Sequence, residues 1–317
     1  MSLSYLIRQG RSNSEKTFQR GFSALNITCT CLLARAMTTR RIVVNGDDFG
    51  RTASINAAII QAHRQGILTS ASLMVAEESL DEAVALAQAH PTLAVGLHLV
   101  AASGRAVLPP TQIPHIVDAQ GRFPESAVQA GLRYVASAAA RQELAWELEA
   151  QFARFAATGL PLSHVDGHLH FHVHPIVFNL LLPLAERYGA RGLRLPRDDF
   201  WLAMRYNRQG AALKATWAII YAVLCRWCLR RLRGRRLTVT DRMYGLMQTG
   251  QMEEAYVLRV LRQMSVRTAE LYFHPSTVPL EEELGPNPGD LATLLSPAVR
   301  QALQEGGIEL VNYPRLI

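Results

Sequence analysis

The sequence RIVVNGDDFG, residues 41–50, joins a short apolar run to two adjacent carboxylates and a glycine. Its Ile42-Val43-Val44 segment is typical of a strand buried on both faces, as in a parallel sheet. Similar apolar runs predict further strands at 67–75, 93–99, 162–165, 192–195, 270–273 and 308–312. Amphipathic stretches between them predict helices at 54–65, 79–89 and 136–157. Strands that alternate with helices predict an α/β fold with parallel strands, whose chemistry lies at their carboxyl ends.

The length and composition of the chain favour one large domain with two additional segments. Of its 317 residues, 49% are hydrophobic and 19% are charged, which excludes a disordered or collagen-like protein. We expect residues 1–37 to be either a mobile leader or the result of an overlong start assignment. We expect residues 38–317 to form one α/β body with an insertion at 201–236. The proline-rich stretch 101–126 is predicted to be an irregular connection of the type that covers a site.

The formal net charge of +7 comes from two segments only. Residues 1–40 contribute +5, and residues 201–236 carry nine basic residues and no acidic one, so the remaining 241 residues carry a net charge of −7. A body that binds nucleic acid is not expected to be acidic, which excludes nucleic acid as the partner. The four cysteines lie only in these two segments and give no sign of an oxidising compartment, so we expect a cytoplasmic protein.

The two carboxylates that end the first predicted strand are Asp47 and Asp48. By itself such a pair is more often a solvated turn or a helix cap, because aspartate is favoured at both. Neighbouring side chains on a strand point to opposite faces. At the end of a strand, however, the backbone turns, and both carboxylates can then enter one pocket.

A run of histidines gives the strongest signal of chemistry. His164, Asp166, His168, His170, His172 and His174 occupy every second position, and this period predicts that all six lie on one face of a strand. Imidazole together with carboxylate oxygen suits a divalent metal of the zinc or magnesium type. A surface tract that scavenges metal, or histidines buried in the core, are the alternatives. Some of these histidines must touch substrate or support the ligands, since a catalytic metal keeps open positions.

Two further histidines end predicted strands. His98 follows Gly96-Leu97, and His274 closes the apolar run Glu270-Leu-Tyr-Phe and precedes a proline that stops the strand. Either could be an ordinary core histidine. Together with Asp47, Asp48 and His168, however, they come from four strand ends, as a metal-dependent hydrolase at the mouth of a barrel requires.

These motifs resemble a known family. The segments 45–50, 96–98, 164–172 and 273–275 match the YdjC-like carbohydrate deacetylases, which remove acetyl groups from N-acetylated sugars, and the resemblance covers about residues 41–317. Within that family the chain looks like the hopanoid-biosynthesis-associated deacetylases (the HpnK subgroup), which act on the N-acetylglucosaminyl head group of a hopanoid. The resemblance implies a distorted (β/α) barrel and one divalent metal ion, Mg or Zn.

The resemblance also implies roles for individual residues. It places the metal on Asp48, His98 and His168 and makes Asp47 the base that takes a proton from water. We expect His274 to protonate the departing amine, although His170 and His172 also lie within reach and are otherwise assigned to the substrate. Arg194 ends a predicted strand, where it either binds sugar hydroxyls or forms a structural ion pair.

The basic insertion predicts a contact with a membrane. Residues 215–225 are uncharged and mostly apolar, and an arginine cluster follows them. A spanning helix needs about 20 apolar residues, so eleven are too few to cross a bilayer. Aromatic and apolar residues beside arginines are instead typical of a helix that lies on anionic lipid, with a buried helix and a solvated basic end as the alternative. The resemblance favours the membrane, on its cytoplasmic face.

Three other functions compete with a glycolipid deacetylase. A soluble chitooligosaccharide-type deacetylase would not need the segment 201–236. A glycosidase would need its two carboxylates on opposite sides of the glycosidic bond. Asp47 and Asp48 are adjacent in the chain and are poorly placed for this. A metal-dependent glycolipid-binding protein would have no need of a base, so Asp47→Asn separates it from an enzyme. The sequence leaves open the metal, the aglycone and the oligomeric state.

Overall fold

A computed structural model describes residues 39–281 and 284–316 of the chain. Eight strands form one sheet in the order β7-β6-β3-β2-β1-β9-β8, with β10 paired to β1. The ladders along this order are all parallel. The strands are β1 (Arg40–Phe49), β2 (Ser70–Leu73), β3 (Ala94–Leu99), β6 (His164–Gly167), β7 (Gly192–Leu193), β8 (Arg242–Tyr244), β9 (Thr268–Phe273) and β10 (Ile308–Val311). The predicted α/β fold with a parallel sheet is confirmed.

The sheet curls so that its two ends approach each other. An isolated parallel bridge joins Gly192 of β7 to Thr238, four residues before β8 begins at Arg242. The backbone N–H of Leu193 donates to the carbonyl of Thr238 at 2.9 Å. The carboxyl ends of the strands therefore surround one opening, where residues from distant strands can meet.

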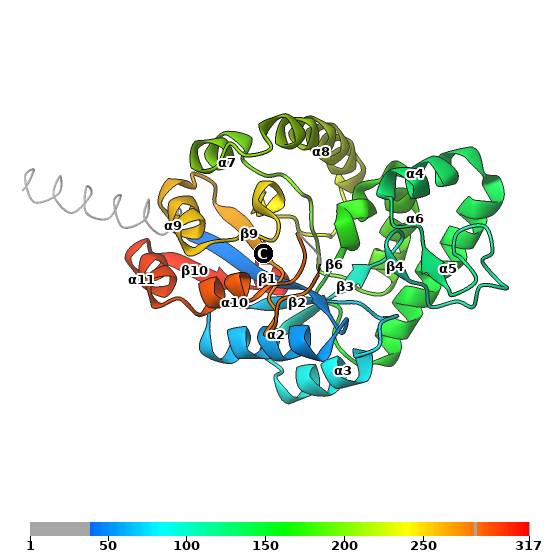
Figure 1. Cartoon of the computed structure of the whole chain (residues 1–317), viewed down its shortest axis with the longest axis horizontal. Helices are drawn as coiled ribbons and strands as arrows, with labels where there is room; N and C mark the ends of the chain where they lie inside the picture. The colour runs from blue at the N-terminus through cyan, green and yellow to red at the C-terminus, as the bar shows by residue number, and fades with distance from the viewer. Residues whose placement is uncertain (1–38, 282–283, 317) are drawn as a thin grey trace, which may run out of the picture. The chain divides into compact units, whose positions relative to one another are not determined.

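Helices surround the sheet (Figure 1). They are α2 (Ala53–Gln65), α3 (Leu80–Ala89), α4 (Ala127–Ala136), α5 (Ala138–Ala157), α6 (Pro175–Arg187), α7 (Phe200–Tyr206), α8 (Ala211–Leu232), α9 (Glu254–Gln263), α10 (Pro288–Leu295) and α11 (Pro297–Glu305). Helix α2 begins where the Thr52 hydroxyl accepts a hydrogen bond from the Ile55 N–H, and it ends at Gly66. The apolar faces of the helices bury a continuous core against the sheet.

Some expected elements differ from those observed. The stretch 101–126 contains the two-stranded ribbon of β4 (Gly104–Arg105) and β5 (Arg122–Phe123). The helix predicted at 136–157 corresponds to α5, whereas α4, which precedes it, was not predicted. Strand β8 was not predicted, because three residues are too few to show an apolar period. The expected leader at 1–37 lies outside the described residues.

The prediction that six polar residues share one strand face is wrong. Strand β6 ends at Gly167, and residues His168–Val173 form 3₁₀ turns in which Leu169 and His170 have φ of 55° and 53°. This left-handed backbone breaks the period of two, because successive side chains no longer alternate between two faces. The histidines therefore point in different directions.

The insertion was predicted to be too short to cross a bilayer because only its eleven uncharged residues were counted. This prediction is wrong, because those residues belong to a longer helix. Helix α8 has 22 residues and is, by length and composition alone, long and apolar enough to span a membrane. The eleven uncharged residues continue in both directions into helical turns that extend its apolar length. Its inner face is nevertheless held on the body, since Cys225 and Cys228 are buried and the Cys228 thiol lies 3.8 Å from the Val173 carbonyl.

Candidate metal centre and active site

The end of β1 brings both adjacent carboxylates into one cavity. The pairing of β1 with β2 shifts register between Gly46 and Phe49, and Asp48 adopts the left-handed φ of 64°. Such a bulge turns a side chain that would otherwise point to the opposite face. Asp47 and Asp48 are 2% and 1% exposed, and both line the same cavity. This confirms that a turn of the backbone lets the pair enter one pocket.

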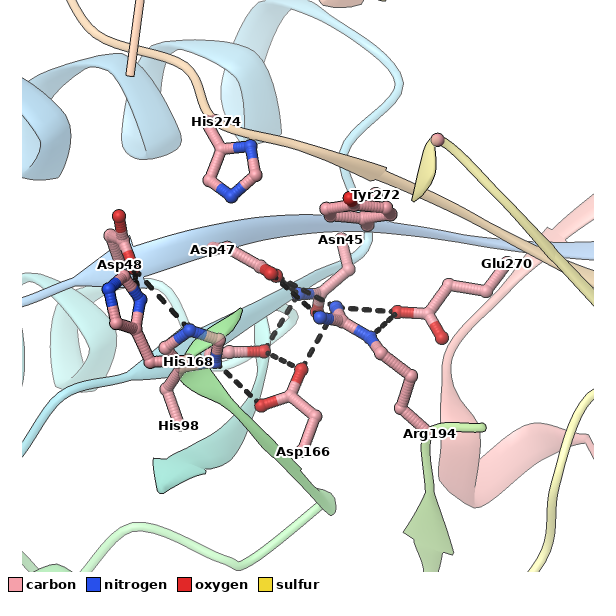
Figure 2. Close-up of polar contacts among 12 residues, drawn as sticks. Asn45, Asp47, Asp48, His98, Asp166, His168, Arg194, Glu270, Tyr272 and His274 are labelled. Atoms are coloured by element: carbon pink, nitrogen blue, oxygen red, sulfur yellow. Dashed lines mark hydrogen bonds and ion pairs between the residues drawn. The ribbon is translucent and has the colours of Figure 1, made fainter. Parts of the chain in front are cut away.

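Asp48, His98 and His168 converge from the ends of β1, β3 and β6 (Figure 2). Asp48 Oδ1 lies 3.4 Å from Nε2 of His98 and 3.3 Å from Nδ1 of His168. Burial alone would raise the pKa of the Asp48 carboxyl, but His168 and His98 hold that pKa well below its ordinary value. The carboxylate is therefore charged and faces two imidazole nitrogens.

The register between β3 and β6 orients the His98 ring. His98 stands opposite Asp166 in the ladder, and its Nδ1 lies 2.8 Å from Asp166 Oδ1. The proton on Nδ1 is donated to this carboxylate, which leaves Nε2 facing Asp48. Burial alone would lower the pKa of His98, but the negative charges of Asp166 and Asp47 raise it to about 10. The charge that favours a proton here equally favours a divalent cation.

The three converging side chains fit a divalent metal ion. Their ligand atoms lie within 4.8 Å of one another, and Asp48 Oδ1 is a buried oxygen with no hydrogen-bond donor. Two imidazoles and a carboxylate are a donor set that divalent zinc-type ions accept, and a carboxylate behind a ligating histidine is the usual support. Asp47, His98 and Asp166 form a second such group, but Asp47 and Asp166 are already paired with Arg194.

Arg194 lies fully buried between three carboxylates (Figure 2). Its two terminal nitrogens each lie 2.7 Å from an oxygen of Asp47, and one of them lies 2.9 Å from Asp166 and 2.7 Å from Glu270. The guanidinium carbon of Arg194 lies 5.1 Å from the centroid of the Tyr272 ring. Arg194 does not line the cavity. Of the two predicted roles, the structure therefore favours the structural ion pair over contact with sugar hydroxyls.

Replacement of Arg194 by methionine is expected to lower the free energy of unfolding by about 3–5 kcal/mol, because buried carboxylates would lose their counter-ion. Urea denaturation measures this change. Arg187→Met is the matched control, since Arg187 pairs with Glu149 at the exposed surface and such pairs are worth about 1 kcal/mol or less. Equal losses in the two variants would contradict a structural role for the buried network.

The remaining predicted histidines divide between cavity and core. His274 and His170 line the cavity, and His170 is buried with no partner for its Nδ1. His172 is fully buried, and its Nε2 donates to the Arg194 carbonyl at 2.9 Å, so it supports the backbone beneath the site and does not contact the cavity. His164 stacks on Tyr313 with ring centroids 4.6 Å apart.

The cavity above these residues has a volume of ≈ 800 Å³. Its lining includes the charged side chains of Glu77, Glu78, Arg105, Arg122 and Glu125. It also includes the apolar and aromatic side chains of Leu169, Trp217, Tyr221, Leu246, Tyr272 and Leu284. A site with a few convergent polar groups and apolar walls suits a ligand that has both polar and apolar parts.

Sequence reasoning missed several residues that shape the site. Asn45 donates to Asp47 at 2.8 Å, and Ser72 donates to Asp166 at 2.7 Å. Glu270 pairs with Arg194 and accepts a hydrogen bond of 2.5 Å from the hydroxyl of Tyr313. Glu270 could have been found from the sequence, because a carboxylate inside an apolar strand must be paired when it is buried. Ser72 and Tyr313 have no comparable feature in the sequence.

Comparison with known proteins gives matches over most of the chain. A family model described as "YdjC-like protein" matches residues 41–305. A carbohydrate deacetylase of Geobacillus stearothermophilus is 30% identical over 86% of this chain and 97% of that protein. A carbohydrate deacetylase of Brevibacillus brevis is 44% identical, over 51% of this chain and 60% of that protein.

Among solved structures, a protein of Enterococcus faecalis V583, for which cellobiose-phosphate cleavage has been proposed, has the same fold. The two chains superpose with a TM-score of 0.66 at 23% identity, over 88% of this chain and 99% of the other. At this identity the likeness concerns the arrangement of strands and helices alone.

Proposed function

The chain belongs to the YdjC-like protein family, and from this membership we propose that it is a metal-dependent carbohydrate N-deacetylase. The observation that carries the proposal is the convergence of Asp48, His98 and His168 at the floor of the cavity, with Asp47 as their neighbour. The carbohydrate deacetylase of Geobacillus stearothermophilus aligns with 86% of this chain and supports the reaction class.

Asp48, His98 and His168 would hold the metal ion. When bound, a divalent ion polarises the acetamide carbonyl and lowers the pKa of water. Asp47 takes the proton of the attacking water. Its Oδ1 accepts from Arg194 and Asn45, while Oδ2 accepts from Arg194 alone, so Oδ2 keeps a free lone pair for that proton.

His274 is proposed to protonate the departing amine. Its ring lines the cavity, and Figure 2 shows it on the side of Asp47 and Asp48 that is opposite Asp166. The His274 backbone N–H donates to Asp290 at 2.8 Å, which fixes the chain where β9 ends. An acid on the far side of the carboxylates can reach the nitrogen while Asp47 reaches the water. His170 lines the same cavity and is proposed to contact the substrate.

The substrate is proposed to be the N-acetylglucosaminyl head group of a hopanoid lipid, reached by an enzyme that docks on the inner face of the cell membrane. Support comes from the basic segment 201–236 and from its helix α8, whose Trp217 and Tyr221 form part of the apolar cavity wall. A polar sugar with an apolar aglycone matches a cavity with walls of both kinds.

The experiment is mass spectrometry of the metal-loaded protein with two substrates, N-acetylglucosaminyl hopanoid in anionic vesicles and soluble N,N′-diacetylchitobiose. Loss of an acetyl group is expected from both. The variant R230E/R231E/R233E, in which three exposed arginines are reversed, is expected to slow the vesicle reaction about tenfold or more and to leave the soluble one unchanged, since each basic residue near anionic lipid is worth about 1 kcal/mol.

The outcomes separate the competing functions. Activity on N,N′-diacetylchitobiose alone would identify a soluble chitooligosaccharide-type deacetylase. Binding of the glycolipid without acetyl loss, in a protein that holds its metal, would identify a glycolipid-binding protein and refute the enzyme.

A further inference from the structure

Helix α4 is apolar on the face that it turns to solvent. Val128, Leu132 and Val135 are 72%, 65% and 60% exposed, and their spacing of four and three residues places them in one stripe. The opposite face buries Ala130 and Tyr134 in the body. A helix that is apolar on both sides is normally covered on both sides. Among the described residues, nothing covers the stripe.

Helix α8 presents a similar face. Ile219 and Val223 are 67% and 65% exposed and lie four residues apart. Arg226 and Arg230, which are also exposed, follow at further steps of three and four residues, so apolar residues give way to arginines along one outward face. The inner face of the helix is fixed by Cys225, Cys228 and Leu232 in the core.

Both helices contribute residues to the lining of the cavity. Ala127 at the start of α4, and Trp217 and Tyr221 of α8, all line the cavity. Between them lies Leu169, which is 44% exposed and whose carbonyl accepts from the Tyr221 hydroxyl at 3.1 Å. The other side of this turn contacts α4 through Phe171 and Tyr134, with ring centroids 6.1 Å apart. Figure 1 shows α8 at the top of the view and α4 to its right, and α6 contacts α8.

The basic residues near both apolar stripes indicate an anionic partner. The segment 201–236 has nine basic residues and no acidic one, and residues 126–142 have Arg133 and Arg141 and likewise no acidic one. Exposed apolar side chains beside basic residues are the chemistry that binds the interface of an anionic bilayer. A lipid surface can also contact two separate helices on either side of an opening at the same time.

We infer that α4 and α8 form a two-helix rim that docks on an anionic bilayer with the cavity mouth between them. The sugar to be deacetylated then enters from the bilayer side, still attached to its lipid. This inference rests on the proposed function for the identity of the reaction, but the docking itself does not depend on turnover. It adds α4 to the membrane contact that the basic segment alone suggested.

The test replaces the α4 stripe in V128Q/L132Q/V135Q and measures co-sedimentation with vesicles of mixed anionic and neutral lipid. Because three apolar side chains would no longer enter the interface, the lipid concentration for half-maximal binding is expected to rise about tenfold, equivalent to about 1.4 kcal/mol. The matched control is W146Q/L310Q, which removes exposed apolar side chains from α5 and β10 and is expected to bind as the wild type does.

Two further measurements keep the outcomes distinct. Circular dichroism and hydrolysis of a soluble N-acetyl-sugar check that the variant is folded, and sedimentation velocity without lipid checks for self-association. Unchanged vesicle binding by the α4 variant, or a wild-type dimer that the variant converts to a monomer, would overturn the inference. Normal lipid docking by a protein with no deacetylase activity would refute the proposed function and leave the rim in place.

Discussion

Alanine at Asp48, His98 or His168 is expected to remove the bound metal and to lower kcat/KM by about 10³-fold or more. The physical reason is that each supplies one ligand atom of a three-atom set, and that Lewis-acid stabilisation of the transition state is worth several kcal/mol. Metal analysis after dialysis measures the occupancy, and release of acetate from N,N′-diacetylchitobiose measures the rate.

The control for these variants is His90→Ala. His90 lies at the end of α3, where its Nδ1 bonds the Leu86 carbonyl at 2.8 Å, and it does not line the cavity. Its loss is expected to leave the metal content unchanged. Wild-type metal content in the Asp48, His98 or His168 variant would remove that residue from the set of ligands.

Asp47→Asn is expected to retain the metal and to lose about 10²- to 10⁴-fold in kcat, because an amide of the same size cannot take the proton of water. The measurement is single-turnover kinetics of the metal-loaded variant together with its metal content. A base role predicts that the rate falls while the metal content stays at the wild-type value, and an unchanged rate would refute that role.

Asp47 is also one of the carboxylates that hold Arg194, so the loss of that ion pair needs its own control. Glu270→Gln removes another carboxylate from Arg194, yet Glu270 does not line the cavity. This variant is expected to keep its rate within about tenfold of the wild type, since proton transfer itself accounts for the larger loss at Asp47. A Glu270→Gln enzyme as slow as Asp47→Asn would assign the effect to the Arg194 network.

The strand ends that carry the candidate metal ligands could be predicted from the sequence, because two patterns identify them. Short apolar runs identify buried parallel strands, and parallel strands bring their carboxyl ends to one edge of the sheet. Asp48, His98 and His168 each follow such a run, so their convergence followed from topology without knowledge of any distance.

The turn after β6 shows where local patterns fail. The histidines at every second position fit a strand, yet the backbone leaves the sheet at Gly167 and turns left-handed at Leu169 and His170. The alternation of residue types carries no information about where a strand stops. His172 consequently lies in the core and His170 in the cavity wall.

The sequence by itself determined the parallel α/β fold, the family and the strand ends that hold the candidate metal ligands. Only the tertiary structure decided what Arg194 does and which helix faces remain uncovered. Arg194 meets Asp47 across 147 positions of the chain, and α4 and α8 both contribute to the lining of one cavity although about 80 residues separate them. The physical reason is that periodicity and residue type are local properties, whereas an ion pair or an exposed surface depends on which distant segments pack together.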